Sequence, residues 1–270
     1  MFIIYGCVSS VSVGDIFIAG IIPGILMGIS LMILSYIYCR VKGYKRTGEK
    51  PTLRKIGKAT KDAIWALILP VIILGSIYGG IVTPTECAVL AVVYSFIIGR
   101  FVYKELTWEK IVKALRDTVS FNGMAMYMLG FAAIFSNFLA VKEIPQALSS
   151  FMMSLDLGPI AILLIVNLFL LVMGCFVENI PATIILTPIL LPIVVAAGMH
   201  PVTFGVVITM NLAIGYITPP YGFGLFVTSM MGKIPFGSML KPAAWMVLAL
   251  TVVLALTTYV PWLTLGLLGY

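Results

Sequence analysis

One stretch of the sequence decides the fold of this chain, Asn211-Leu-Ala-Ile-Gly215-Tyr-Ile-Thr218-Pro219-Pro220-Tyr-Gly222-Phe-Gly224. It interrupts an apolar run over residues 204–231 that is long enough to cross a bilayer, which takes about 20 residues of helix. Two successive prolines remove two backbone donors, and the glycines lower helix propensity, so this run predicts a helix broken inside the membrane. Bare backbone groups at that depth are tolerated only inside protein or beside a polar cavity, and secondary transporters use them to bind ions and substrates. A proline kink without a ligand is the alternative interpretation.

The composition places the chain among polytopic helical membrane proteins. Of 270 residues, 61% are hydrophobic and 10% are charged, and the mean hydropathy is +1.13. The apolar runs reach the length of membrane-spanning helices and do not alternate as barrel strands do. The four scattered cysteines lack metal-ligand spacing, and the sequence has no nucleotide-binding or hydrolase motif. We therefore predict no enzyme, no catalytic residue, no nucleic-acid partner and no cofactor beyond a coupling ion.

The basic residues set the topology. Nine of the seventeen Lys and Arg residues lie between Arg40 and Lys61, and this loop is cytoplasmic by the positive-inside rule. The resulting arrangement places sixteen of the seventeen on the cytoplasmic side and only Lys142 outside. We expect four segments: residues 1–39 with a first span at 16–39; a basic loop at 40–62; scaffold-like spans with a cytoplasmic amphipathic helix at 63–141; and a transport half at 142–270. The last holds a re-entrant hairpin at 159–197, the broken helix at 204–231 and a final helix at 243–265.

The hairpin prediction depends on length and charge. Its apolar arms, residues 160–172 and 184–197, are shorter than a full span needs, and the turn between them carries no Lys or Arg. Two full spans would give the same sidedness and remain the alternative. Glu178 and Asn179 lie in that turn, and an ionisable group at membrane depth is by default a candidate functional residue.

The hairpin turn and the broken helix together predict an ion site. The amides of Asn179 and Asn211, the hydroxyls of Thr183 and Thr218, and carbonyls of the unwound turns are hard oxygen ligands that suit Na⁺. Helix starts after Pro181 and Pro220 could hold a carboxylate. For Glu178 the alternative is a carboxylate that caps a helix near cytoplasmic water, and for Asn211 it is an interhelical hydrogen bond. Glu86, just after Pro84, is interpreted as a dipole-complementing carboxylate in preference to a proton relay.

Three motifs make the sequence resemble a known family. They are Gly80-Ile-Val-Thr83-Pro84-Thr85-Glu86, Thr187-Pro188-Ile-Leu-Leu-Pro192, and the stretch from Asn211 to Gly222. In this order they resemble the large membrane subunit, DctM type, of TRAP (tripartite ATP-independent periplasmic) transporters, and the likeness covers essentially the whole chain. The resemblance implies an elevator-type fold of the ion-transporter superfamily, with about six transmembrane segments and one re-entrant hairpin.

The resemblance also implies partners and site residues. It implies Na⁺-coupled uptake of organic acids such as C4-dicarboxylates or sialic acids, delivered by a periplasmic solute-binding protein, with a small membrane subunit bracing the scaffold in the bacterial or archaeal inner membrane. The residues that match the family's ion site run from Glu178 to Thr183 and from Asn211 to Gly222; they are Glu178, Asn179, Thr183, Asn211, Gly215, Thr218, Pro219, Pro220 and Gly222. Na⁺ is expected at Asn179, Thr183, Gly215 and Thr218. Asn179 replaces the Thr common in the family.

The family's subunit has two inverted repeats, and this chain matches only the second, so we expect it to be a carboxyl-terminal part that does not transport alone. Two other functions remain open. One is an elevator anion symporter of the same superfamily that needs no binding protein. The other is a membrane scaffold fragment without transport activity.

Overall fold

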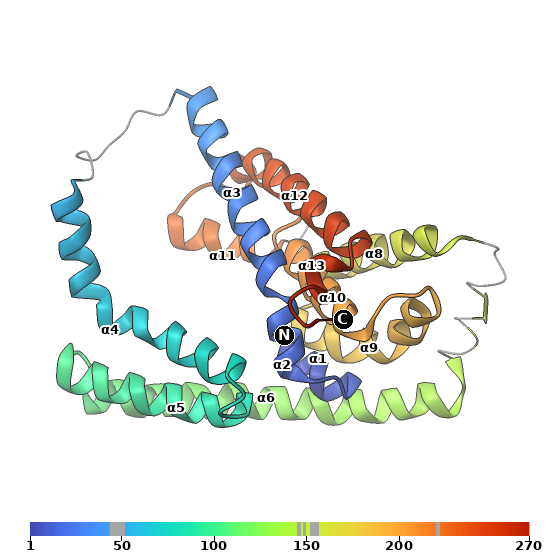
Figure 1. The fold of residues 1–270 in the computed structure, drawn as a ribbon, viewed down its shortest axis with the longest axis horizontal. Helices are drawn as coiled ribbons and strands as arrows, with labels where there is room; N and C mark the ends of the chain where they lie inside the picture. Colours follow the sequence, from blue (N-terminus) through green and yellow to red (C-terminus); the bar gives the residue numbers. More distant parts are fainter. Residues whose placement is uncertain (44–51, 145–146, 148–149, 152–156, 220–221, 270) are drawn as a thin grey trace. The chain divides into compact units, whose positions relative to one another are not determined.

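The computed structural model describes residues 1–43, 52–144, 147, 150–151, 157–219 and 222–269. Helices are the only regular elements in this described part (Figure 1). Six of them are long and apolar enough to cross a membrane; they are Val13–Val41, Gly57–Tyr78, Pro84–Val102, Pro159–Phe176, Asn179–Ala196 and Phe236–Tyr259. The predicted all-α, multi-pass membrane architecture is therefore confirmed.

The chain divides into two compact units, Tyr44–Met124 and the remainder. The smaller unit contains α4 (Leu53–Tyr78), α5 (Pro84–Ile97), a π-helical turn (Ile98–Val102) and the beginning of α6 (Trp108–Val141). The hydroxyl of Tyr94 donates to the carbonyl of Trp65 at 2.7 Å, which ties α5 to α4. One continuous α6 replaces the predicted amphipathic helix and separate span.

The start of α5 is a capping box. The backbone N–H of Glu86 donates to the hydroxyl of Thr83 at 3.3 Å, and the Glu86 carboxylate accepts from the Thr83 backbone N–H at 2.8 Å. Pro84 occupies the first turn, where its missing N–H costs nothing. The carboxylate therefore has the helix-starting position that the sequence predicted for it.

The larger unit is built around α10 (Pro201–Tyr216), which lies among the other helices of this unit (Figure 1). Its side chains are buried along almost its whole length. Around it pack α1 (Phe2–Ser9), α2 (Val13–Ala19), α8 (Pro159–Phe176), α9 (Asn179–Ala196), α12 (Phe236–Tyr259) and α13 (Trp262–Leu265). A helix that is apolar on every side is stable only when neighbours surround it, and these helices cover most of the surface of α10. Tyr5 of α1 is fully buried against Gly205 and donates its hydroxyl to the carbonyl of Pro201 at 2.7 Å.

The predicted interruption of the 204–231 run is confirmed. The first half-helix is α10, which ends at Tyr216, and the second is α11 (Phe223–Gly232). Gly222 precedes α11 with a φ of 42°, a left-handed conformation that glycine adopts without a Cβ penalty. Pro219 lies in the turn, whereas Pro220 is outside the described residues and its contribution stays a prediction.

The region predicted as a re-entrant hairpin forms two joined helices whose lengths exceed those that the sequence suggested; that it is re-entrant stays a prediction. The helices α8 and α9 have 18 residues each and are joined through Val177 and Glu178. The prediction of short arms was wrong because helix continues through Gly174–Phe176 and begins again at Asn179, two residues before Pro181. At about 1.5 Å per residue each arm is about 27 Å long, so length alone does not separate a re-entrant hairpin from two spans.

Two outer spans also differ from their predicted bounds. The first span starts at Val13 and is divided at Gly20 into α2 and α3 (Ile21–Val41). The last helix was predicted at 243–265, but α12 covers Phe236–Tyr259 and stops before Pro261. The residue before a proline is driven out of the helical region, and Val260 has φ −117° and ψ 86°.

Candidate functional site where the hairpin turn meets the broken helix

The backbones of α8 and α10 touch at two glycines. A Cβ added to Gly215 would lie 2.5 Å from both the Cα and the carbonyl carbon of Gly174. A Cβ added to Gly174 would lie 3.1 Å from the Cα atoms of Gly215 and Leu212. Small residues allow this kind of approach between membrane helices. The two helices therefore meet with no side chain between them at this point.

This contact brings the two predicted segments together. The hairpin turn at Glu178 begins three residues after Gly174, and the interruption of the broken helix begins two residues after Gly215. Because α8 and α10 both end at this level, the carbonyl ends of two helices face the same region, and the amino-terminal ends of α9 and α11 follow directly. Carbonyl ends favour cations and amino-terminal ends favour anions.

A buried chain of polar side chains joins α10 to α8 and α12. Asn211 donates its amide to Oδ1 of Asn167 at 2.7 Å and to the carbonyl of Val207 at 2.9 Å. Asn167 in turn donates to the hydroxyl of Thr258 at 3.1 Å, and this hydroxyl donates to the carbonyl of Leu254 at 2.9 Å. All donors point from Asn211 towards Leu254, so the chain of bonds ends on the Leu254 carbonyl and brings no donor to Oδ1 of Asn211.

Two amide oxygens at this site have no hydrogen-bond partner within the described part of the chain. They are Oδ1 of Asn211 and Oδ1 of Asn179. Asn211 is fully buried, and both protons of its amide are already donated, which polarises its oxygen towards a positive ligand. A buried unpaired polar atom costs free energy, so both oxygens need a donor or a cation.

The remaining predicted residues lie around this region with different roles. Glu178 is exposed at the start of α9, where it makes no side-chain capping bond. Thr183 is buried and donates to the carbonyl of Asn179 at 2.7 Å. Thr218 donates to the carbonyl of Ile214 at 2.6 Å. Each hydroxyl donates inside its own helix and keeps lone pairs that can accept a second partner.

The donor set fits a hard monovalent cation better than a transition metal. It consists of amide, hydroxyl and carbonyl oxygens, which are the ligands that broken membrane helices use for Na⁺. Within the described residues, no group of three or more His, Cys, Asp or Glu side chains comes together as a metal site. Asn179, Thr183, Gly215 and Thr218 remain the residues that we predict to hold Na⁺.

Sequence reasoning missed Asn167 and Thr258. Asn167 is the one amide in the run Ile160–Val172 and is 7% exposed. A lone Asn inside an apolar span was the signal, because such a residue needs a partner in a neighbouring helix. His200 caps the start of α10, where its Nδ1 accepts from the backbone N–H of Val202 at 3.3 Å.

Comparison with known proteins identifies the family that the sequence resembles. Residues 1–263 match the family described as "Tripartite ATP-independent periplasmic transporter, DctM component". The chain is 41% identical over 96% of its length to an isethionate TRAP transporter permease protein of Oleidesulfovibrio alaskensis, and 38% identical over 99% to a sialic acid TRAP transporter large permease protein of Vibrio cholerae. It is also 38% identical over 98% of its length to a C4-dicarboxylate TRAP transporter large permease protein of Pseudomonas aeruginosa.

The matches cover only part of each relative. The chain spans 41% of the length of the Oleidesulfovibrio protein, 64% of the Vibrio protein and 62% of the Pseudomonas protein. All three names describe transporter components and none describes an enzyme, in agreement with the prediction from sequence.

Proposed function

The chain belongs to the DctM family of TRAP transporter components, and from this premise we propose that it forms the half of a Na⁺-coupled permease subunit that carries one ion site. In this proposal the chain lies in the inner membrane of a bacterium or archaeon. It works with a small membrane subunit and receives its substrate from a periplasmic solute-binding protein. Its substrate is an organic acid such as a C4-dicarboxylate or a sialic acid.

The observation that carries the proposal is the unpaired oxygen of Asn211 beside the contact of Gly174 with Gly215. A fully buried acceptor whose amide protons are both donated lacks only a positive partner. The second unpaired oxygen, on Asn179, belongs to the first residue of α9. Asn179 follows the end of α8 by three residues, and Asn211 precedes the end of α10 by five residues. Helix carbonyl ends attract cations.

Two observations besides the cation site support an organic acid as the substrate. The amino-terminal ends of α9 and α11 are positive dipole ends and suit a carboxylate. The three relatives are named for isethionate, sialic acid and C4-dicarboxylate, and all three substrates are organic anions. The proposal therefore stays at the level of an organic acid.

The first test measures Na⁺ binding by thermal stability. We expect NaCl at ten times Kd to stabilise the purified chain by about 1.4 kcal/mol relative to KCl at equal ionic strength, which is measured as a higher unfolding temperature. Thr218→Val should weaken this effect. Thr228→Val is the matched control, since Thr228 is exposed and donates the same kind of bond to the carbonyl of Gly224 at 2.7 Å. No difference between the two salts would contradict a Na⁺ carrier and favour a scaffold.

The second test separates the two transporter functions. Uptake of the organic acid by the assembled complex in proteoliposomes should require both the solute-binding protein and an inward Na⁺ gradient. Na⁺-driven uptake that does not depend on the binding protein would instead favour an anion symporter of the same superfamily. If uptake requires the binding protein but is unchanged when KCl replaces NaCl, Na⁺ coupling is refuted and the partnership with the binding protein stands.

A further inference from the structure

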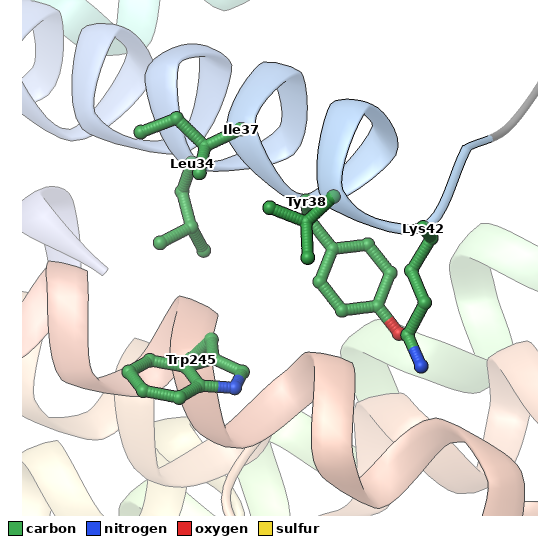
Figure 2. Close-up of a pocket in the computed structure, with 6 residues that line it drawn as sticks. Leu34, Ile37, Tyr38, Lys42 and Trp245 are labelled. Carbon is green, nitrogen blue, oxygen red and sulfur yellow. The ribbon is translucent and has the colours of Figure 1, made fainter.

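A groove of about 380 Å³ lies between α3 and α12, away from the site described above (Figure 2). Its lining comes from one stripe of α3 and one residue of α12; these are Leu34, Ile37, Tyr38, Val41, Lys42 and Trp245. The α3 residues recur at intervals of three and four, so they share one face of that helix and the groove follows its axis. The size lies within the range of small-molecule sites.

The groove has the length of one membrane leaflet. Leu34 and Lys42 are eight residues apart, or about 12 Å along a helix, and one leaflet of a 30 Å hydrocarbon core is about 15 Å thick. Val41 is the last residue of the first span and Lys42 caps its helix, so the open end of the groove lies at the cytoplasmic surface. Trp245 is half-exposed, as aromatic residues at membrane interfaces are.

The open end carries a positive charge without a partner among the described residues. Figure 2 shows the Lys42 side chain extending beside the Tyr38 hydroxyl at one end of the groove. Arg40, two residues earlier, is engaged elsewhere, since its guanidinium donates to the hydroxyl of Tyr36 at 2.9 Å and lies over that ring. The rest of the lining is apolar apart from the Tyr38 hydroxyl and the Trp245 indole N–H.

We propose that this groove binds an anionic phospholipid of the cytoplasmic leaflet, with one acyl chain along α3 and the phosphate on Lys42. An apolar wall of leaflet length that ends in a single ammonium matches such a lipid in shape and in charge. In sequence, Lys45, Arg46 and Lys50 follow Lys42, and basic residues directly after a span favour anionic lipid. The inference depends on the membrane topology and not on the proposed transport function.

The test uses Trp245 as a reporter inside the groove. Trp65, Trp108 and Trp262 are changed to Phe, and the chain is placed in phosphatidylcholine bilayers that contain a few per cent of brominated lipid. We expect brominated phosphatidylglycerol to quench Trp245 with about five-fold higher apparent affinity than brominated phosphatidylcholine. Both headgroups carry a phosphate, but only phosphatidylglycerol lacks the choline cation, so only its headgroup has a net negative charge for the Lys42 ammonium. Lys42→Gln should abolish this preference. Lys233→Gln, at another exposed lysine that ends a helix, should keep it.

Two further outcomes test the occupant. Leu34→Phe narrows the groove and should reduce quenching by both lipids; unchanged quenching would mean that the groove does not take the acyl chain and that another protein segment covers it. Soluble glycerol phosphate should not compete, and competition would show a phosphate site without a lipid.

Equal quenching by the two lipids would overturn the proposal. Native mass spectrometry of the chain with all four tryptophans should show phosphatidylglycerol adducts that Lys42→Gln reduces and Lys233→Gln retains.

Discussion

Asn211 is the residue on which the candidate site depends. Its amide donates to Asn167 and to the carbonyl of Val207, and its oxygen is unpaired among the described residues. Inside a membrane an amide is kept only where its hydrogen bonds compensate for the cost of burial. The alternative considered from sequence, an interhelical hydrogen bond, is therefore present, and the free oxygen leaves room for a ligand as well.

We expect Asn167→Leu to lower the free energy of unfolding by about 0.6–1.7 kcal/mol, the range measured for interhelical hydrogen bonds in membranes. The substitution removes the acceptor of Asn211 and the donor to Thr258 together. The double variant with Asn211→Leu should lose less than the sum of the two single variants, because the two residues share one bond. Chemical denaturation in detergent measures the free energy of unfolding of all three variants.

Asn122→Leu is the control for this cycle, because Asn122 is exposed on α6. It should leave the free energy of unfolding almost unchanged. Additive losses at Asn167 and Asn211 would show that the observed bond does not couple the two residues.

The sequence predicted the role of single residues where those residues change the conformation that the backbone can adopt. The prolines and glycines after Asn211 identified the helix interruption because they change what the backbone can do. Asn167 was missed because its partner is 44 residues away in the chain. An apolar run with one amide does not indicate which neighbouring helix the amide faces, and only packing determines that.

At the scale of elements, the contact of α8 with α10 requires two glycines. We expect Gly215→Ala to destabilise the chain by about 1–3 kcal/mol, because its Cβ would overlap the backbone of Gly174 and force the helices apart. Gly28→Ala is the matched control, since nothing lies within 4 Å of a Cβ there, and it should be neutral or stabilising by up to about 1 kcal/mol. Thermal unfolding measures both. Equal effects would contradict the backbone contact.

The depth of the hairpin turn is a second prediction at this scale. The turn carries no Lys or Arg, so we still expect a re-entrant hairpin although its arms are long. In a variant without the native cysteines, Glu178→Cys should react more slowly with a membrane-impermeant maleimide in inside-out vesicles than Lys61→Cys. Lys61 lies in the basic first part of α4, which we predict to face the cytoplasm. Equal rates would place the turn at the cytoplasmic surface and favour two complete spans.

Element boundaries were predicted least well where a polar or proline residue occurs inside a helix. Pro181 was interpreted as preceding the start of a helix, yet it is the third residue of α9. The final helix was predicted to begin at residue 243, yet α12 begins at Phe236 and includes Lys241. A proline early in a helix costs little because the first N–H groups have no partner, so proline alone does not fix a start.

For the whole molecule, topology is the most direct test of the membrane architecture. In the same cysteine-free background, Lys142→Cys should react with an impermeant maleimide from outside intact cells, whereas Lys61→Cys should react only in inside-out vesicles. The reason is that sixteen of seventeen basic residues then face the cytoplasm. Reaction at both positions from the same side would refute the topology and, with it, the cytoplasmic location of the lipid groove.

The crossing of Gly174 with Gly215 also limits how the hairpin could move. Where two backbones touch directly, one helix can rotate against the other about that point but cannot slide past it without a clash. Glu178 is about 6 Å along the helix from this pivot, whereas Pro159 at the other end of α8 is about 22 Å from it. A rocking motion of α8 about this contact would thus displace Pro159 several times farther than Asn179, which directly follows the hairpin turn and carries one of the unpaired oxygens.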